Sequence, residues 1–370
     1  MRRTPWYVWA SVVSVTCIVA GGYWDISWHM SIGRDSFWTP AHLAIQLGGV
    51  TAGLSGAVLI LGTTLGRAAA LREASIGVWG FRGPTGAFVG AWGAATMVVS
   101  APFDNWWHAA YGLDVKVLSP PHMVLTIGIL GVAVAGVLLV VATMNRAAGA
   151  ERDRLRWALL IIGGETLVLA MTAILEHTFR SNLHRADAYR AVALVAPVML
   201  LAMAQVSGHR WGATLLAAFY MGFMATMVWV FPLFPAEPKL GPVYQPITHF
   251  VPLEFPLLLI APAIAVDVAR ARLAHRPRWA QGAVLGALFL VALVAVEWPF
   301  ATFLQSPAAR NAVFGTDYMP YFIHPDWDTA RHVFIPDAAP VTGMLEALGA
   351  ALLTAWLGLV VGDALRRVRR

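Results

Sequence analysis

Residues 121–144 read PHMVLTIGILGVAVAGVLLVVATM, and the twelve residues that follow, NRAAGAERDRLR, contain four arginines. The first stretch has no Asp, Glu, Lys or Arg, and as a helix it is long enough to cross the roughly 30 Å of hydrocarbon in a bilayer. Long apolar runs separated by short Arg-rich connections recur along the chain, which is 58% hydrophobic and 12% charged. Soluble domains carry about 25% charged residues. We therefore predict a polytopic membrane protein.

Ten apolar runs have the length of a membrane span, which predicts an all-α transmembrane bundle of about ten helices. They cover about residues 6–28, 41–63, 84–103, 121–144, 157–176, 188–207, 211–232, 251–269, 279–300 and 341–363. The net charge of +6 does not indicate nucleic acid as a partner, because the basic residues lie in the connections and form no patch. The single cysteine, Cys17, excludes an intramolecular disulfide and a thiolate metal cluster.

The basic residues divide the connections into two sets. Of the 26 Lys and Arg, 18 lie at the two ends of the chain and in every second connection. By the positive-inside rule this set is cytoplasmic, so we expect both termini in the cytoplasm. Nine of the eleven histidines lie in the opposite set, and only His209 and His275 are on the cytoplasmic side. The preference for Arg over Lys is typical of GC-rich bacteria, and the first run lacks a signal-peptide cleavage site, so the expected location is a bacterial cytoplasmic membrane.

Two outer connections repeat one pattern. The first has WDISWH at residues 24–29 and PAH at 40–42, and the second has FDNWWH at 103–108 and PPH at 120–122. In both, a Gly-x-Asp lies between the two parts, and it ends at Asp35 in the first copy and at Asp114 in the second. The pattern predicts an internal parallel repeat of two helical hairpins. We accordingly expect a four-helix metal-binding module in residues 1–150 and a six-helix transmembrane region with an outer loop cap in residues 151–370.

The spacing in each copy brings one carboxylate and two imidazoles together. Asp25 and His29 are four residues apart, so they share one face of a helix, and His42 opens the next helix and can return beside them. The second copy repeats this arrangement. The predicted metal ligands are thus the Asp25 set (Asp25, His29 and His42) and the Asp104 set (Asp104, His108 and His122). Such ligands suit Cu, Zn, Fe or Ni. The alternative for either copy is an ion pair or loop anchor at the membrane interface.

The two sets resemble the copper sites in the C subunit of copper membrane monooxygenases, the family of particulate methane and ammonia monooxygenases. That subunit carries a first site Asp-x3-His-x12-His and a neighbouring second site Asn-x3-His-x13-His. The Asp25 set matches the first site in order and spacing. The Asp104 set matches the second, except that Asp104 stands where the family has Asn. The resemblance covers about residues 20–145, and the rest of the chain has no counterpart in the shorter family subunit.

The resemblance implies one or two copper ions, with zinc as the second choice, and favours the Asp25 set as the reactive site. It implies a monooxygenase-type oxidoreductase subunit that activates O2 for a lipophilic or small apolar substrate. Its partners would be the lipid bilayer and additional oxidase or cupredoxin-like subunits, or further copies of the chain. The rival function is non-catalytic copper storage, delivery or transport. A haem or quinone protein is a third choice, which leaves the aspartates without a role.

Four further features of the sequence are candidates for a functional or a structural role. Glu165 lies deep in the fifth predicted span, where a lone charge is expensive, so it must be protonated or hydrogen-bonded. Glu254 and Glu297, near outer helix ends, are candidates for carrying protons. His249 is a candidate supplementary ligand, with packing at a helix start as the default. The aromatic, proline-rich segment 301–340 is expected to form a lid.

Overall fold

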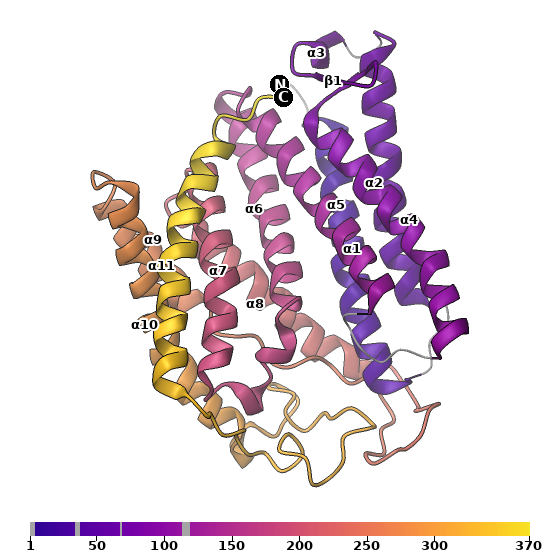
Figure 1. Cartoon of the computed structure of the whole chain (residues 1–370), viewed down its shortest axis with the longest axis vertical. Helices are drawn as coiled ribbons and strands as arrows, with labels where there is room; N and C mark the ends of the chain where they lie inside the picture. The colour runs from indigo at the N-terminus through magenta and orange to yellow at the C-terminus, as the bar shows by residue number, and fades with distance from the viewer. Residues whose placement is uncertain (1–3, 34–37, 67–68, 113–118) are drawn as a thin grey trace. The chain divides into compact units, whose positions relative to one another are not determined.

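The structure, a computed structural model, describes residues 4–33, 38–66, 69–112 and 119–370. Within these residues, nine helices are long and apolar enough to cross a membrane, which confirms the all-α class and the multi-pass character (Figure 1). They are α1 (Trp6–Ser31), α2 (Pro40–Thr64), α4 (Thr85–Tyr111), α5 (Pro120–Met144), α6 (Gly149–Thr172), α7 (Ala186–Ser207), α8 (Gly212–Val230), α10 (Arg278–Leu304) and α11 (Pro340–Leu365).

The shorter elements lie in the connections. Between α2 and α4 come α3 (Ala69–Arg72) and a hairpin of β1 (Ile76–Val78) and β2 (Phe81–Gly83), in which Val78 pairs with Phe81. The two turn residues, Trp79 and Gly80, both have positive φ, as a two-residue hairpin turn of type I′ requires. The remaining elements are the 3-10 turns η1 (Leu175–His177), η2 (Arg180–Asn182), η3 (Phe231–Leu233) and η4 (Pro307–Ala309), and the helix α9 (Ile260–Arg272).

The eighth predicted span, 251–269, is helical only in its second half. Helix α9 begins at Ile260, and the residues before it form no regular secondary structure. Pro252 and Pro256 explain the difference, because each lacks an N–H group and disfavours the helical conformation of the residue before it. The 13 residues of α9 rise only about 20 Å, less than the thickness of the hydrocarbon.

Contacts between Cα atoms divide the chain into two compact units. Unit 1 consists of Met1–Gly22, Ser36–Thr166 and Leu365–Arg370, and unit 2 of Tyr23–Asp35 and Leu167–Ala364. The domain boundary predicted between residues 150 and 151 rests on the sequence repeat. It stays a prediction, because compactness does not test whether the first four spans form a repeated module.

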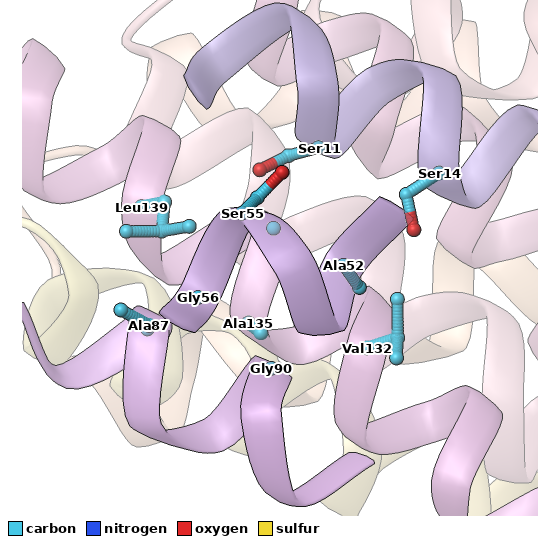
Figure 2. Close-up of a pocket in the computed structure, with 12 residues that line it drawn as sticks. Ser11, Ser14, Ala52, Ser55, Gly56, Ala87, Gly90, Val132, Ala135 and Leu139 are labelled. Atoms are coloured by element: carbon cyan, nitrogen blue, oxygen red, sulfur yellow. The ribbon is translucent and has the colours of Figure 1, made fainter. Parts of the chain in front are cut away.

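In unit 1, helix α4 packs against α2 and α5 through small residues (Figure 1). A Cβ atom on Gly93 of α4 would lie 2.8 Å from the backbone oxygen of Gly128 in α5, so the two helices touch through their backbones. Such close packing replaces the hydrophobic driving force that lipid does not supply. The same unit encloses a cavity of about 20 Å³ with polar lining from Ser11, Ser14 and Ser55 (Figure 2). This is room for a single water molecule.

In unit 2, residues 250–272 run antiparallel to α8 along its length. At one end, the backbone N–H of Phe250 donates to the carbonyl of Phe234, just after α8, at 3.0 Å. At the other end, Asp267 Oδ2 accepts from the backbone N–H of Thr214, in the first turn of α8, at 2.9 Å. The segment therefore returns beside α8 as a discontinuous span. Its first half forms no regular secondary structure and its second half is α9.

The first and last long helices have ends that lie close together in unit 1. The hydroxyl of Tyr7, at the start of α1, lies 3.2 Å from Oγ1 of Thr143 at the end of α5. Nδ2 of Asn145, just after α5, donates to the carbonyls of Leu365 and Val368 at 2.9 and 2.8 Å. The start of α1 and the end of α11 thus lie at the same end of unit 1.

Candidate metal centre

The two copies of the motif occupy equivalent positions in their helices, as the sequence predicts. Asp25 and His29 lie in the last two turns of α1, and the corresponding residues of the Asp104 set lie in the last two turns of α4. His42 and His122 are each the third residue of a helix that begins with proline. The relation of the two hairpins as a parallel repeat stays a prediction.

Each of these two helices has Thr or Ser at its N-cap position, directly before its first proline. Thr39 caps α2, and its Oγ1 accepts the backbone N–H of His42 at 3.3 Å. Ser119 holds the N-cap position of α5. N-capping by Ser or Thr together with proline at the first helical position fixes where a helix begins. The sequence therefore determines that the third histidine of each copy stands in the first turn of its helix.

The Asp25 set is divided between the two units. Asp25 Oδ2 and His29 Nε2 lie 3.9 Å apart on one face of α1, in the part of the helix that belongs to unit 2. His42 belongs to unit 1. The prediction that the two residues share a helix face is confirmed, and the convergence of His42 on them stays a prediction.

The Asp104 set lies wholly within unit 1, where its carboxylate faces both imidazoles. Asp104 Oδ2 is 3.5 Å from Nε2 of His108, and Oδ1 is 3.6 Å from Nε2 of His122. Both distances exceed a normal N–H···O hydrogen bond. They are close to the separation of about 3.0–3.4 Å between ligand atoms that share one ion at metal–ligand bonds of 2.0–2.2 Å. Among the described residues, Asp104 Oδ1 is buried and has no hydrogen-bond partner, so it is an acceptor that a cation would satisfy.

A backbone carbonyl orients the ring of His108. Its Nδ1 lies 3.2 Å from the carbonyl oxygen of Gly112, which ends α4 with a positive φ of 87°. A carbonyl can only accept, so Nδ1 donates and therefore carries the ring hydrogen. In the neutral imidazole, Nε2 then keeps its lone pair and faces Asp104. Metal-binding histidines are commonly fixed in this way, with the second ring nitrogen bonded to a carbonyl or carboxylate.

The set is not a preformed three-ligand site. Within the part of the chain that the structure describes, no group of three or more His, Cys, Asp or Glu side chains is arranged to hold a metal ion as it stands. Binding by all three residues of the Asp104 set would therefore require side-chain rotation. Asp35 and Asp114, expected to hydrogen-bond their loops or orient the histidines, lie outside the described residues. The metal assignment of both sets stays a prediction.

An aromatic cluster surrounds the end of α4, and the sequence analysis gave it no role beyond the motif. The rings of Trp107 and Tyr111 lie 4.5 Å apart between centroids. Trp106 contacts Phe103, Trp107 and Tyr111 at 6.0, 6.5 and 6.0 Å. In the sequence, the signal for this cluster is the occurrence of four aromatic residues within 103–111. All four aromatic residues lie in the C-terminal part of α4, the same helix as Asp104 and His108.

His249 and the segment 301–340 lie in unit 2 and make structural contacts. The ring of His249 packs against Tyr318 at 5.0 Å, which fits the packing role weighed for it. The segment 301–340 interacts with the connection after α8, because the backbone N–H of Tyr244 donates to the carbonyl of Tyr321 at 2.8 Å. These two long connections lie at the same end of the helices of unit 2 (Figure 1).

A buried ion pair in unit 2 was also missed by the sequence analysis. Nη1 of Arg180 donates to Oε2 of Glu254 at 3.2 Å, and the arginine side chain is 3% exposed. Burial, followed by the positive charges of Arg180 and Arg310, lowers the pKa of His332 to about 4. His332 is therefore neutral at pH 7. Arg180 and Glu254 are 74 residues apart in the sequence, so no local spacing indicates their ion pair.

The metal preference of the motif follows from the ligand atoms that its residues supply. Imidazole nitrogens with a single carboxylate suit transition metals such as copper and zinc better than Mg²⁺ or Ca²⁺, which prefer oxygen ligands throughout. No protein-family model, no curated protein and no solved structure matches this chain.

Proposed function

We propose that the chain is a copper-binding membrane protein that serves as a subunit of a monooxygenase-type oxidoreductase. The observation that supports this function is the Asp104 carboxylate facing Nε2 of His108 and of His122 at 3.5 and 3.6 Å. Copper bound there would supply redox chemistry for the activation of O2. The Asp25 set would hold a second ion and, by resemblance, is the favoured reactive site.

The Asp104 set and the aromatic residues at the end of α4 would have three roles. Asp104 contributes a negative charge where the resembling family has a neutral Asn, and this charge favours cation binding. His108 presents Nε2 in a fixed tautomer because its Nδ1 donates to Gly112. The rings of Trp106, Trp107 and Tyr111, clustered at the same end of α4, would offer an apolar surface to a lipophilic substrate.

We also propose that both termini are cytoplasmic and that the two sets face the outside of a bacterial cytoplasmic membrane. The support is the concentration of arginine at the chain ends and in alternate connections. The shared location of the start of α1 and the end of α11 in unit 1 agrees with termini on one side of the membrane.

Metal analysis of single variants tests the copper proposal. The full-length chain, purified in detergent and loaded with Cu²⁺, should retain one or two ions after desalting, with an EPR spectrum that shows nitrogen coupling. His108→Ala should lose about one ion per chain, because it removes a ligand. Asp104→Asn should weaken the binding at that set with little loss of structure, because Asn has nearly the same shape as Asp.

The matched control is His275→Ala, which removes an exposed histidine from the connection between α9 and α10 and should leave the copper content unchanged. Unchanged copper in His108→Ala and in a separate His122→Ala variant would refute the Asp104 set as a metal site. Zinc retained in place of copper would refute the copper assignment.

Copper handling without catalysis is the second candidate function. The observation in its favour is that the three side chains of the Asp104 set are 20–27% exposed, so a bound ion could exchange with a carrier. Oxygen consumption by copper-loaded protein with a chemical reductant, lost in His108→Ala, would favour the oxidoreductase. Rapid transfer of copper to a chelator without oxygen consumption would favour storage or delivery.

A further inference from the structure

Glu297 of α10 lies beside the point where the discontinuous span changes from non-helical chain to helix. Its Oε2 accepts the backbone N–H of Leu258 at 2.8 Å, just before α9. From the other side, the hydroxyl of Tyr220 in α8 hydrogen-bonds the backbone of Leu257. Backbone groups outside a helix must find partners inside a membrane. Side chains of α8 and α10 therefore supply the hydrogen bonds that the break in the span requires.

The break lies about midway along α8. Ile260, where α9 begins, precedes Asp267 by seven residues, which is about 10 Å of helical rise, and Leu258 lies two residues before Ile260. Asp267 is hydrogen-bonded to the first turn of α8, a helix of 19 residues and so about 28 Å long. The Glu297 carboxyl group is thus far from both ends of α8 and is 1% exposed.

The Glu297 carboxyl group is incompletely satisfied. Its second oxygen, Oε1, is buried and has no hydrogen-bond partner in the described residues, and no ion pair to Glu297 occurs among them. An ionised carboxylate held by a single amide N–H in such a place is expensive unless a cation or a proton joins it. One oxygen is therefore occupied by the protein, and the other is left for a ligand.

The groups packed around Glu297 provide no permanent positive charge for it. Tyr189 of α7 and Tyr220 of α8 are the titratable groups that act on it, and both are neutral hydroxyls. Among the described residues, the ion pairs of the neighbouring elements do not include Glu297. These pairs are Arg180 with Glu254, Arg185 with Asp187, Arg190 with Asp187 and Glu346, Arg270 with Asp267, and Arg278 with Asp363.

We propose that Glu297 is a membrane-embedded proton-binding site, in which the proton occupies Oε1 while Oε2 holds the Leu258 amide. A proton removes the buried charge and requires only one acceptor nearby. A sodium ion would require several oxygen ligands around Oε1 at once. Carboxyl groups beside discontinuous spans are where membrane proteins commonly bind coupling ions. The site uses residues of unit 2 only, so it does not depend on the copper proposal.

Proton exchange at Glu297 would be coupled to the position of the discontinuous span. Ionisation strengthens the hydrogen bond that Oε2 accepts from Leu258 and leaves Oε1 in need of a donor. Pro299, two residues further along α10, lacks the N–H that would bond the carbonyl of Ala295, so this part of the helix is less constrained. The proposed role is thus a proton-dependent movement of residues 250–259, the non-helical half of the span, against α10.

A lipophilic carbodiimide tests the site, because it modifies protonated carboxyl groups within membranes. In the full-length protein in lipid vesicles, peptide mass spectrometry should find the adduct on Glu297 at neutral pH, with less adduct as pH rises. Glu297→Gln should abolish that adduct and keep the acceptor for Leu258 N–H. Glu165→Gln, which changes the buried carboxyl group of α6 in unit 1, is the matched control and should leave the Glu297 adduct unchanged.

Infrared spectroscopy supplies a second measurement that needs no reagent. The carboxylic-acid carbonyl band of the wild-type protein should lose one component in Glu297→Gln, and that component should vanish from the wild type at high pH. Absence of both the adduct and a band that depends on Glu297 would overturn the proposal. Protection from the carbodiimide by Na⁺ at constant pH, which choline does not give, would also overturn it in favour of a sodium site.

Discussion

At the scale of single residues, charged groups in unit 2 are stabilised by pairing, and the depth of each pair decides its contribution. Arg180 is 3% exposed and its partner Glu254 is 16% exposed, so removing one charge leaves the other buried and unpaired. Glu254→Gln should therefore lower the free energy of unfolding by about 3–5 kcal/mol, measured as a lower midpoint of thermal unfolding in detergent. Asp187→Asn, which acts on the half-exposed pair with Arg190, should change it by about 1 kcal/mol or less. Equal effects of the two variants would contradict this ranking.

At the scale of helices, unit 1 depends on glycines that let backbones touch. A Cβ on Gly93 would lie 2.8 Å from the backbone of both Gly128 and Val132, whereas one on Gly222 of α8 would meet nothing within 4 Å. Gly93→Ala should destabilise the protein by about 1–3 kcal/mol, because α4 and α5 must separate. Gly222→Ala, measured in the same thermal unfolding experiment, should be neutral or stabilising by up to about 1 kcal/mol, because Ala favours a helix. The contact would be refuted if Gly93→Ala were as stable as the control.

The elements also show how far the sequence determines the fold. Nine spans followed from apolar runs, since a helix of about 20 apolar residues is the simplest way to satisfy the backbone in lipid. The helix positions of Asp104 and His108 followed from their spacing of four. The break before α9 did not follow, because hydropathy is the same for an extended and a helical apolar segment, although Pro252 and Pro256 carried the signal. Nor could the sequence reveal that Glu297 meets Leu258, because that contact joins residues 39 positions apart.

At the scale of the whole molecule, the sidedness of two connections depends on whether residues 250–272 cross the membrane. Asp153 lies in the second turn of α6, next to the connection after α5, and Asp326 lies between α10 and α11; their side chains are 62% and 88% exposed. With ten crossings, an odd number of them separates the two positions, so they lie on opposite sides. If the segment did not cross, both would lie on the same side. The arginine distribution further predicts that Asp153 is cytoplasmic.

Cysteine labelling distinguishes these cases. In a Cys17→Ser background, which removes the single native thiol, the Asp326→Cys variant should react with a membrane-impermeant maleimide on intact cells. The Asp153→Cys variant should react only after the cells are permeabilised. Labelling of both variants on the same side would mean that residues 250–272 do not cross, and the discontinuous span that Glu297 is proposed to serve would be refuted. Labelling with the two sides exchanged would keep the ten crossings but reverse the orientation, so the Asp25 and Asp104 sets would face the cytoplasm.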